Sequence, residues 1–250
     1  MAAGKKILIL GGTGEARELA SRAVEKFGTG VEVISSLAGR TAGPEAIAGS
    51  VRSGGFGGSE GLAAYLRDEN ISCVIDATHP FAAEITAHAH AACLRQDVPR
   101  LLLERPPWDP PAGGRWVEVK DMAEAAAALP RLGKRVFLTT GRRVEAFTDV
   151  PDTWFLVRLM EAPAEPLPLA DHQVIIGRPP FDLADERKII DEHRIDCLVS
   201  KMSGGDATRA KIVAAHDAGI PVLLIARPFL PLGNAVATVH EAIQWLEARL

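Results

Sequence analysis

Short apolar runs alternate along the chain with longer segments of helical periodicity. The runs hold four to six residues and are almost continuously apolar, which is typical of strands buried on both faces of a parallel sheet. They lie at Lys6–Leu10, Val31–Ser35, Ser72–Ala77, Arg100–Leu103, Arg135–Thr139, Trp154–Leu159, Gln173–Ile176, Cys197–Ser200 and Val222–Ile225.

Helices are expected in the amphipathic, often alanine-rich segments between several of these runs. They lie at Glu15–Phe27, Glu60–Asp68, Ala83–Gln96, Met122–Leu129, Asp185–His193, Ala207–Ala218 and His240–Leu250. Because strand and helix alternate with short connections, the pattern predicts an α/β fold.

The stretch Glu104–Gly114 interrupts this alternation. It holds four prolines and two glycines in eleven residues, a composition that excludes a helix or a central strand. We therefore expect it to link two domains, residues 1–108 and 109–250. The predicted architecture is two Rossmann-like, doubly wound α/β domains with mostly parallel sheets and a cleft between them.

The composition narrows the class of protein. The chain has 250 residues, 47% of them hydrophobic, which is enough for two compact domains. A net charge of −4 without a basic run argues against a nucleic-acid partner. No signal peptide and no apolar run of roughly 20 residues is present, so we expect a cytoplasmic protein without membrane contact. The oligomeric state is left open.

The sequence lacks the residue patterns that several common kinds of functional site require. Cys73, Cys93 and Cys197 are widely separated and form no CxxC pair, so we expect buried apolar roles rather than zinc binding or disulfides. Glu84 and His88 lie four residues apart on one expected helix, but two ligands make a poor metal site, and no metal is predicted. A Walker A loop and a nucleophile elbow are also missing.

A glycine-rich loop follows the first apolar run. Glycines allow a tight strand-to-helix turn and let backbone N–H groups approach a phosphate, and the helix N-terminus adds partial positive charge. The loop therefore predicts a dinucleotide phosphate site, with a plain tight turn as the alternative. Its residues are Gly12, Thr13, Gly14, Glu15 and Ala16.

The end of the second run indicates which dinucleotide binds. An NAD site usually has an acidic residue about 20 residues beyond the glycine loop, but two serines and an arginine stand in this region instead. Hydroxyl groups and a guanidinium suit a 2′-phosphate, so the sequence favours NADPH over NADH. The alternative is a solvated loop arginine. The residues are Ser36, Leu37, Ala38, Gly39 and Arg40.

Two further loops are expected at the same edge of the sheet. The stretch GGFGG is too rich in glycine for a simple turn and predicts a loop that lets backbone approach a flat ligand at Gly55, Phe56 and Gly57. The run Ser72–Ala77 carries Asp76 near its end and is followed by Thr78, His79 and Pro80. We expect His79 to face the site and consider it for proton transfer, whereas Asp76 can instead accept backbone N–H groups of its own loop.

Taken together, LGGTGEA, SSLAGRT, GGFGG, VIDATHPFA and VSKMSGG, in this order, resemble the precorrin-6A reductases of cobalamin biosynthesis. The resemblance spans nearly the whole chain. It implies NADPH as cofactor and a ring-contracted tetrapyrrole with many carboxylates as substrate. Hydride would pass from nicotinamide C4 to a macrocycle carbon, with protonation of the adjacent carbon by His79 or a bound water. It also adds four residues to the cofactor site: Lys201, Ser203, Gly204 and Gly205.

A polycarboxylate substrate requires cations at the strand ends. Arginine binds carboxylates through two parallel hydrogen bonds, although each candidate can also be a solvated loop residue. The candidates are Arg142, Arg143, Arg178 and Arg227. Arg158, inside an apolar run, is expected to pair with an internal acid.

Three alternative functions stay open. The first is a cobalt-precorrin-6A reductase that uses NADH. The second is a non-catalytic module that senses NADP, although the second domain, with its own glycine loop, argues against it. The third is a transferase that binds a sugar nucleotide across two Rossmann-like domains.

Overall fold

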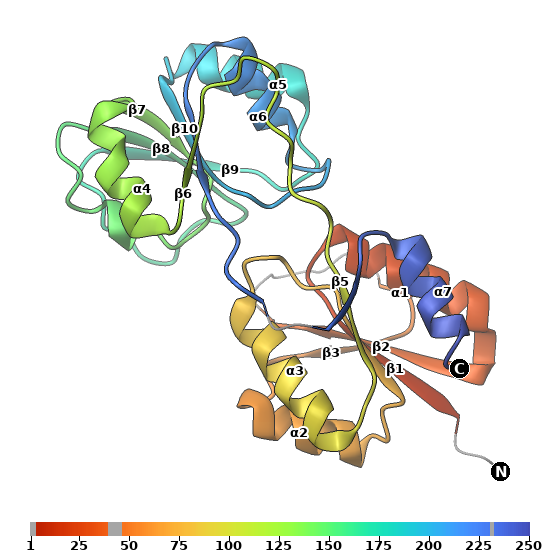
Figure 1. The fold of residues 1–250 in the computed structure, drawn as a ribbon. Coiled ribbons are helices and arrows are strands. Elements are labelled where there is room, and N and C mark those ends of the chain that lie inside the picture. The colour runs from red at the N-terminus through yellow and green to blue at the C-terminus, as the bar shows by residue number, and fades with distance from the viewer. Residues whose placement is uncertain (1–3, 40–46, 231–232) are drawn as a thin grey trace. The chain divides into compact units, whose positions relative to one another are not determined.

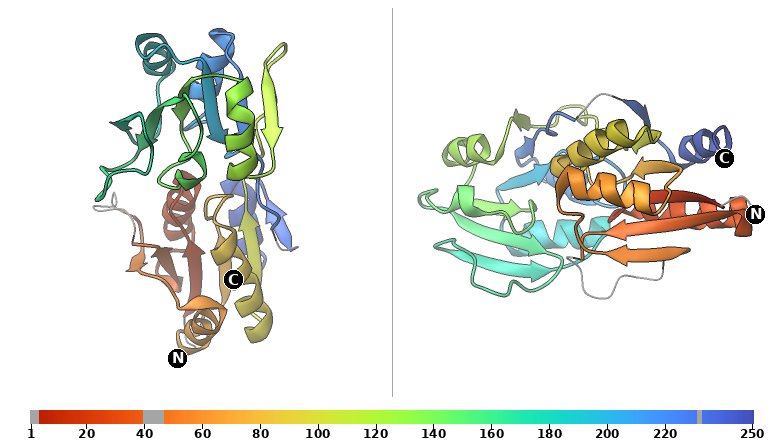
Figure 2. Two further views of the ribbon diagram at one scale, coloured as in Figure 1. Left: turned by 90° about the vertical axis from the view of Figure 1, so that its left-hand side faces the viewer. Right: turned by 90° about the horizontal axis from the view of Figure 1, so that it is seen from below.

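The computed structural model describes residues 4–39, 47–230 and 233–250. The chain divides into two compact units, Met1–Arg105 with Pro228–Leu250, and Pro106–Arg227. Each unit is built on a six-stranded, all-parallel sheet with helices on its faces, as the alternating pattern predicts (Figures 1 and 2).

In the first unit, a helix follows four of the six strands along the chain. The strands run in the order β12-β5-β4-β1-β2-β3. They are β1 (Lys5–Leu10), β2 (Val31–Leu37), β3 (Ser50–Ser53), β4 (Cys73–Asp76), β5 (Arg100–Leu103) and β12 (Asn234–Val236). The helices are α1 (Gly14–Phe27), α2 (Gly58–Asp68), α3 (Ala83–Gln96) and α7 (Val239–Glu247).

Alternate residues of β1 supply both faces of this sheet. Ile7 and Ile9 pack with α1 and α7, whereas Leu8 and Leu10 pack with α2 and α3. All four side chains are almost fully buried. This explains why the strand is continuously apolar, because a parallel strand with helices on both sides has no polar face.

The second unit repeats the arrangement with one permutation. Its strands run in the order β6-β11-β10-β7-β8-β9. They are β6 (Trp116–Val119), β7 (Arg135–Leu138), β8 (Trp154–Leu159), β9 (His172–Ile176), β10 (Cys197–Lys201) and β11 (Val222–Ile225). The helices are α4 (Met122–Ala128), α5 (Leu183–Glu192) and α6 (Ala210–Asp217). The two sheets differ in one edge strand. In the first sheet the edge strand next to β5 is β12, the last strand of its unit along the chain, whereas in the second sheet the edge strand next to β11 is β6, the first strand of its unit.

The expected domain boundary is wrong for the C-terminal segment. The division itself falls inside the proline-rich stretch, as expected, but residues 228–250 return to the first unit. There β12 extends the sheet by pairing with β5, and Val239, Ala242 and Leu246 of α7 join its core. The first unit is therefore built from two separate segments of the chain, which a single boundary cannot describe.

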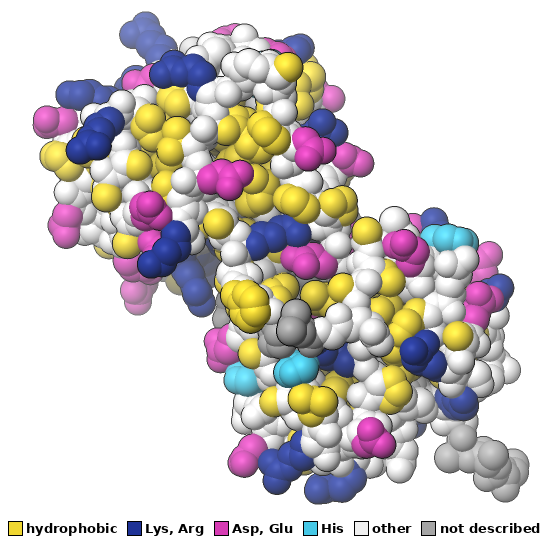
Figure 3. Space-filling model, viewed as in Figure 1, with side chains coloured by type: hydrophobic (Ala, Val, Ile, Leu, Met, Phe, Trp, Pro, Cys, Tyr) yellow, Lys and Arg dark blue, Asp and Glu magenta, His cyan; other side chains and the backbone are white. Residues whose placement is uncertain are grey.

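Other residues bear out the sequence-based expectations. Cys73, Cys93 and Cys197 are free and buried, and burial raises the pKa of each thiol to about 12. Arg158 of β8 pairs with Glu186 of α5 at 2.6 Å, with both side chains almost fully buried. Figure 3 shows cationic and anionic side chains interspersed on the face drawn, in keeping with the small net charge.

Candidate functional site

The first sheet has its switch point between β1 and β4. From β1 the chain adds β2 and β3 on one side and then crosses to add β4 on the other. In open parallel sheets, ligands bind at the carboxyl ends of the strands at such a point. The loops that follow β1 and β4 are the predicted glycine loop and the predicted Thr78–Pro80 segment.

Thr13 ties the glycine loop to the start of α1 and to the residue that follows β4. Its Oγ1 accepts a hydrogen bond from Ala16 N at 3.1 Å as the N-cap of α1, and donates to Ala77 O at 2.7 Å. Gly12 has a φ of +109°, and open space surrounds the position of its missing Cβ.

Four consecutive N–H groups of this loop are available for a ligand. Those of Gly12, Thr13, Gly14 and Glu15 meet no acceptor among the described residues. They lie at the N-terminus of a 14-residue helix, where the macrodipole also favours an anion. The Glu15 carboxylate, by contrast, accepts from Arg105 Nη1 at 2.8 and 2.9 Å, so this side chain is engaged within the protein.

Ser36, at the end of β2, has a cationic partner that the sequence did not single out. Arg52 of β3 donates through Nη1 to Ser36 Oγ at 2.6 Å and through Nη2 to Gly55 O at 3.2 Å. Leu37, Ala38 and Gly39 follow Ser36, and Arg40 lies outside the described residues. A guanidinium therefore does stand at the end of β2, but it comes from the neighbouring strand.

The GGFGG loop is anchored by its aromatic residue. The Phe56 ring packs edge-on against Tyr65 and carries the Arg52 guanidinium 3.8 Å above its centroid. Gly55 and Gly57 on either side are exposed. The loop is therefore held by its central side chain, which leaves the flanking backbone accessible.

Asp76 organises the loop that follows β4. The carboxylate is fully buried, and its Oδ1 accepts from Thr78 N at 3.2 Å and from Thr78 Oγ1 at 2.7 Å. Its Oδ2 lies 3.6 Å from Nη1 of the buried Arg100. Of the two roles considered for Asp76, the contacts support loop stabilisation.

His79 is half-buried in this loop, just before Pro80. Its Nδ1 accepts a hydrogen bond from Phe81 N at 3.2 Å. An acceptor nitrogen carries no proton, so this bond assigns the ring proton of the neutral imidazole to Nε2.

The second sheet has its own switch point, between β7 and β10. Of the predicted residues, Lys201 ends β10, and the loop that follows carries Ser203, Gly204 and Gly205. Both glycines have a positive φ, +68° and +73°, and their N–H groups meet no acceptor among the described residues. Lys201 is largely buried, and burial, aided by the nearby charge of Arg143, lowers the pKa of its ammonium group.

Two of the predicted substrate arginines converge on one acid. Arg178 Nη2 lies 2.7 Å and Arg142 Nη2 3.9 Å from the Glu161 carboxylate. All three follow the carboxyl ends of their strands, β9, β7 and β8. Arg227 differs from these two, because it donates through Nε to Met202 O at 2.9 Å and through Nη2 to Ser203 O at 3.1 Å.

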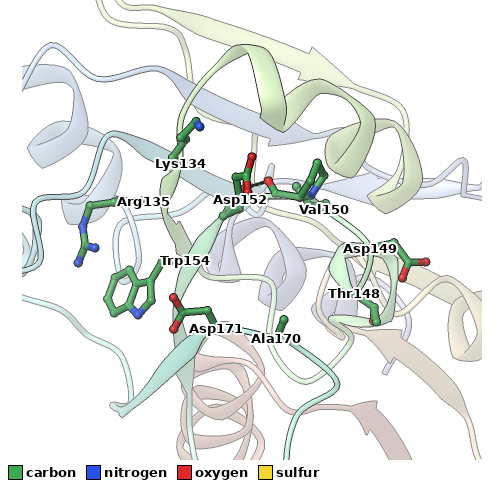
Figure 4. A pocket seen from close by; sticks show the side chains of 11 residues that line it. Lys134, Arg135, Thr148, Asp149, Val150, Asp152, Trp154, Ala170 and Asp171 are labelled. Atoms are coloured by element: carbon green, nitrogen blue, oxygen red, sulfur yellow. Dashed lines mark hydrogen bonds between the residues drawn. The ribbon is translucent and has the colours of Figure 1, made fainter.

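A pocket of about 520 Å³ lies at the opposite edge of this sheet (Figure 4). It is lined by the starts of β7 and β8, including Arg135 and Trp154, and by the loop that holds Asp149 and Asp152. The amino ends of parallel strands are not where ligands of doubly wound folds bind. In each unit, the candidate ligand-binding residues are therefore those at the carboxyl ends of its strands.

Across residues 4–39, 47–230 and 233–250, no group of three or more His, Cys, Asp or Glu side chains is placed to hold a metal ion. No helix within these ranges is long and apolar enough to cross a membrane.

Comparison with known proteins identifies relatives along almost the whole chain. The family model "Precorrin-6x reductase CbiJ/CobK" matches residues 6–247. A protein of Rhodococcus erythropolis named precorrin-6A reductase is 48% identical over 245 residues, which covers 96% of this chain and 97% of that protein. A Rhodobacter capsulatus protein of the same name is 43% identical over 242 residues, or 96% and 95% of the two chains.

A solved structure agrees with these sequence matches. The structure titled "CobK precorrin-6A reductase" superposes with a TM-score of 0.92 at 42% sequence identity. The superposition covers 98% of this chain and 97% of that one.

Proposed function

The chain belongs to the precorrin-6x reductase family CbiJ/CobK, and on that premise we propose that it reduces precorrin-6A with NADPH. One C–C double bond of the macrocycle would be lost. The nicotinamide C4 of bound NADPH would supply the hydride, and a proton would add to the adjacent carbon. The products would be the dihydro-tetrapyrrole and NADP⁺.

The observation that carries the cofactor proposal is the row of unpartnered N–H groups at Gly12–Glu15. Four donors at a helix N-terminus fit a pyrophosphate, which brings negatively charged oxygens to the same point. In the proposal, the backbone N–H groups of Gly12, Thr13, Gly14 and Glu15 hold this group, and Ala16, whose N–H donates to Thr13 Oγ1, fixes the turn beside it. The Glu15 side chain serves the loop through Arg105 instead.

NADPH is preferred over NADH because of the charge at the end of β2. Ser36 and Arg52 form a hydroxyl–guanidinium pair there, and an acidic residue that would bind the ribose hydroxyls of NADH does not stand next to Ser36. We propose that this pair, with residues 37–39 and Arg40, binds the 2′-phosphate. Arg40 is included in this proposal on the basis of the sequence alone, because it lies outside the described residues.

The nicotinamide half is assigned to the two remaining loops of the first unit. We propose that Gly55, Phe56 and Gly57 present backbone to it, and that Thr78, His79 and Pro80 lie beside it. His79 would point its Nε2–H to the ligand, and it can deliver the proton when its imidazole is doubly protonated. Enzymes of this kind owe most of their rate to orientation and exclusion of water, so no large single-residue effect is required.

The substrate proposal uses the cations of the second unit. Arg142, Arg143 and Arg178 would bind carboxylates of the tetrapyrrole, with Arg227 at the same edge of the sheet. Lys201, Ser203, Gly204 and Gly205 form the second ligand loop and would meet a cofactor phosphate or a substrate carboxylate.

Paired titrations test the proposal. NADPH and NADH are added to the purified protein while nicotinamide fluorescence is followed, and precorrin-6A reduction is then monitored by the change in its absorption spectrum. Tight NADPH binding, weak NADH binding and NADPH-dependent reduction are expected. Equal affinities would move the assignment to an NADH-using reductase, and failure to bind either nucleotide would overturn the cofactor site.

A further inference from the structure

The Lys201–Gly205 loop is held by two side chains from distant parts of the chain. The polypeptide passes between its two units twice, after Arg105 and after Arg227. Trp108 follows the first passage, and Arg227 ends the second unit before the second passage. Both contact the loop, although they are more than a hundred residues apart in sequence.

Trp108 forms a hydrogen bond to the C-terminal end of the loop. Its Nε1–H donates to Gly205 O at 2.7 Å, and the side chain is 7% exposed. Its ring belongs to the core cluster that also contains Met202. Because the indole is packed in the core, the position of Gly205 is tied to the core of the unit.

Arg227 forms hydrogen bonds to the middle of the same loop. Its Nε and Nη2 bind two successive carbonyls, those of Met202 and Ser203. Arginine can do this because its guanidinium is a rigid fork, whereas a lysine offers a single ammonium. A Cβ on Gly204 would collide with Pro106 O and would lie 2.6 Å from Arg227 Nη2, so the clamp also requires glycine there.

These contacts engage carbonyl groups of the loop and leave two of its N–H groups available. The carbonyls of Met202, Ser203 and Gly205 are all used by the two side chains. The N–H groups of Gly204 and Gly205 meet no acceptor among the described residues. A loop in which three carbonyls are bound from one side while two successive glycine N–H groups are available is suited to an anionic ligand.

We infer that Trp108 and Arg227 are positioning residues that hold the Lys201–Gly205 loop in its ligand-binding conformation. Neither residue has to touch the substrate: Arg227, expected from the sequence to bind a substrate carboxylate, acts here through Met202 and Ser203. The inference rests on the proposed function, in which this loop binds a ligand anion.

Conservative substitutions with matched controls test the inference. Trp108→Phe keeps an aromatic ring and loses one hydrogen bond, and its control is Trp116→Phe, because Trp116 Nε1 is buried without a partner in the described structure. Arg227→Lys keeps the charge and loses the fork. Its control is Arg187→Lys, since Arg187 also uses Nε and Nη2, but toward the exposed Asp217.

We expect kcat/KM for precorrin-6A to fall about 3- to 10-fold in Trp108→Phe and about 10-fold or more in Arg227→Lys. Both controls should stay within about twofold of the wild type. The loop carries Lys201, whose pKa is lowered by burial, so loosening the loop should also move the alkaline limb of the pH–rate profile upward. A variant that only loses stability, with the surroundings of Lys201 unchanged, would not shift that limb.

The outcomes separate the two proposals. A wild-type protein that does not reduce precorrin-6A contradicts the proposed function. An active wild type whose Trp108→Phe and Arg227→Lys variants match their controls in kcat/KM and in pH profile overturns the positioning role. Thermal unfolding and the amide NMR signals of Gly204 and Gly205 show whether each variant is folded and whether its loop has moved, and unmoved signals likewise count against the inference.

Discussion

The Arg52 guanidinium binds the Ser36 hydroxyl at 2.6 Å while it rests 3.8 Å above the Phe56 ring. One side chain of β3 therefore connects the end of β2 to the GGFGG loop. Its second nitrogen, which donates to Gly55 O at 3.2 Å, completes the link. A cation held in this way is preorganised, so binding a phosphate there costs little side-chain entropy.

Arg52→Gln is the first prediction. A charge-assisted hydrogen bond contributes about 1.5–3 kcal/mol. Loss of the charge should therefore raise the Kd for NADPH about 10-fold or more, while the Kd for NADH hardly changes. Fluorescence titration with both nucleotides measures the two values.

Arg67→Gln is the matched control for this prediction. Arg67 is exposed, belongs to the same unit and pairs with the adjacent Asp68, so its substitution removes the same charge at a distance from the loops. It should leave both affinities unchanged. If Arg52→Gln weakened NADPH and NADH equally, Arg52 would be a support of the Gly55 loop and not a 2′-phosphate ligand.

The strands that the sequence failed to reveal explain why Arg52 was missed. The pattern of apolar runs located nine strands, and the three others are β3, β6 and β12. All three lie at an edge of their sheet. An edge strand is covered on fewer sides, and β3, with the sequence SVRS, is mostly exposed. Such a strand needs no apolar run, so hydrophobic periodicity cannot detect it.

Contacts between distant segments were the other limit. The glycine loops could be located because a tight turn near a ligand demands a residue type at a fixed place in the sequence. The partners of these loops, such as Arg105 for Glu15 and Trp108 for Gly205, carry no such local signature. Their roles follow from the sheet order and from the two passages of the chain between the units.

Thr13→Val is the second prediction. Valine keeps the shape of threonine but loses both hydrogen bonds of Oγ1, the cap of α1 and the link to Ala77 O. Loss of an N-cap costs about 1–2 kcal/mol. We expect the free energy of unfolding in urea to fall by about that amount and NADPH to bind more weakly.

Thr13→Ser is the control, because serine restores the hydroxyl without the methyl group. It should recover most of both the stability and the affinity. A valine variant as stable as the wild type would show that the hydroxyl contributes nothing to the turn.

The third prediction concerns the buried pair of Asp76 and Arg100, whose side chains are 0% and 6% exposed. Removing one member leaves an uncompensated charge in the interior, which typically costs about 3–5 kcal/mol. Asp76→Asn and Arg100→Met should each show a loss of this order in urea unfolding. The double variant should lose clearly less than the sum of the two.

The exposed pair of Arg187 and Asp217, 2.6 Å apart, provides the comparison cycle. Water screens this pair, so its coupling should be about 1 kcal/mol or less. Equal coupling energies in the two cycles would contradict the distinction between the buried and the exposed pair.

The last prediction concerns Lys211 of α6, which is 5% exposed. Burial, helped by the charges of Arg158 and Lys201 and opposed by that of Glu186, lowers the pKa of its ammonium group from 10.5 to about 7. The Trp108 ring lies 6.0 Å from its Nζ. Between pH 7 and 10.5 the unfolded chain therefore holds a proton that the folded chain lacks.

Stability must then rise with pH in this window, because unfolding takes up a proton. With a slope of at most about 1.4 kcal/mol per pH unit, we expect Lys211 to account for a gain of about 2 kcal/mol between pH 7 and 9. Lys211→Met, which removes the amine, should be more stable than the wild type at pH 6, and the difference should shrink toward pH 9. In Lys188→Met, which replaces an exposed lysine of α5, the free energy of unfolding should depend on pH in the same way as in the wild type. If Lys211→Met also showed the wild-type pH dependence in urea unfolding across this range, Lys211 would keep its proton in the folded protein, and Glu186 would have to be its counter-ion.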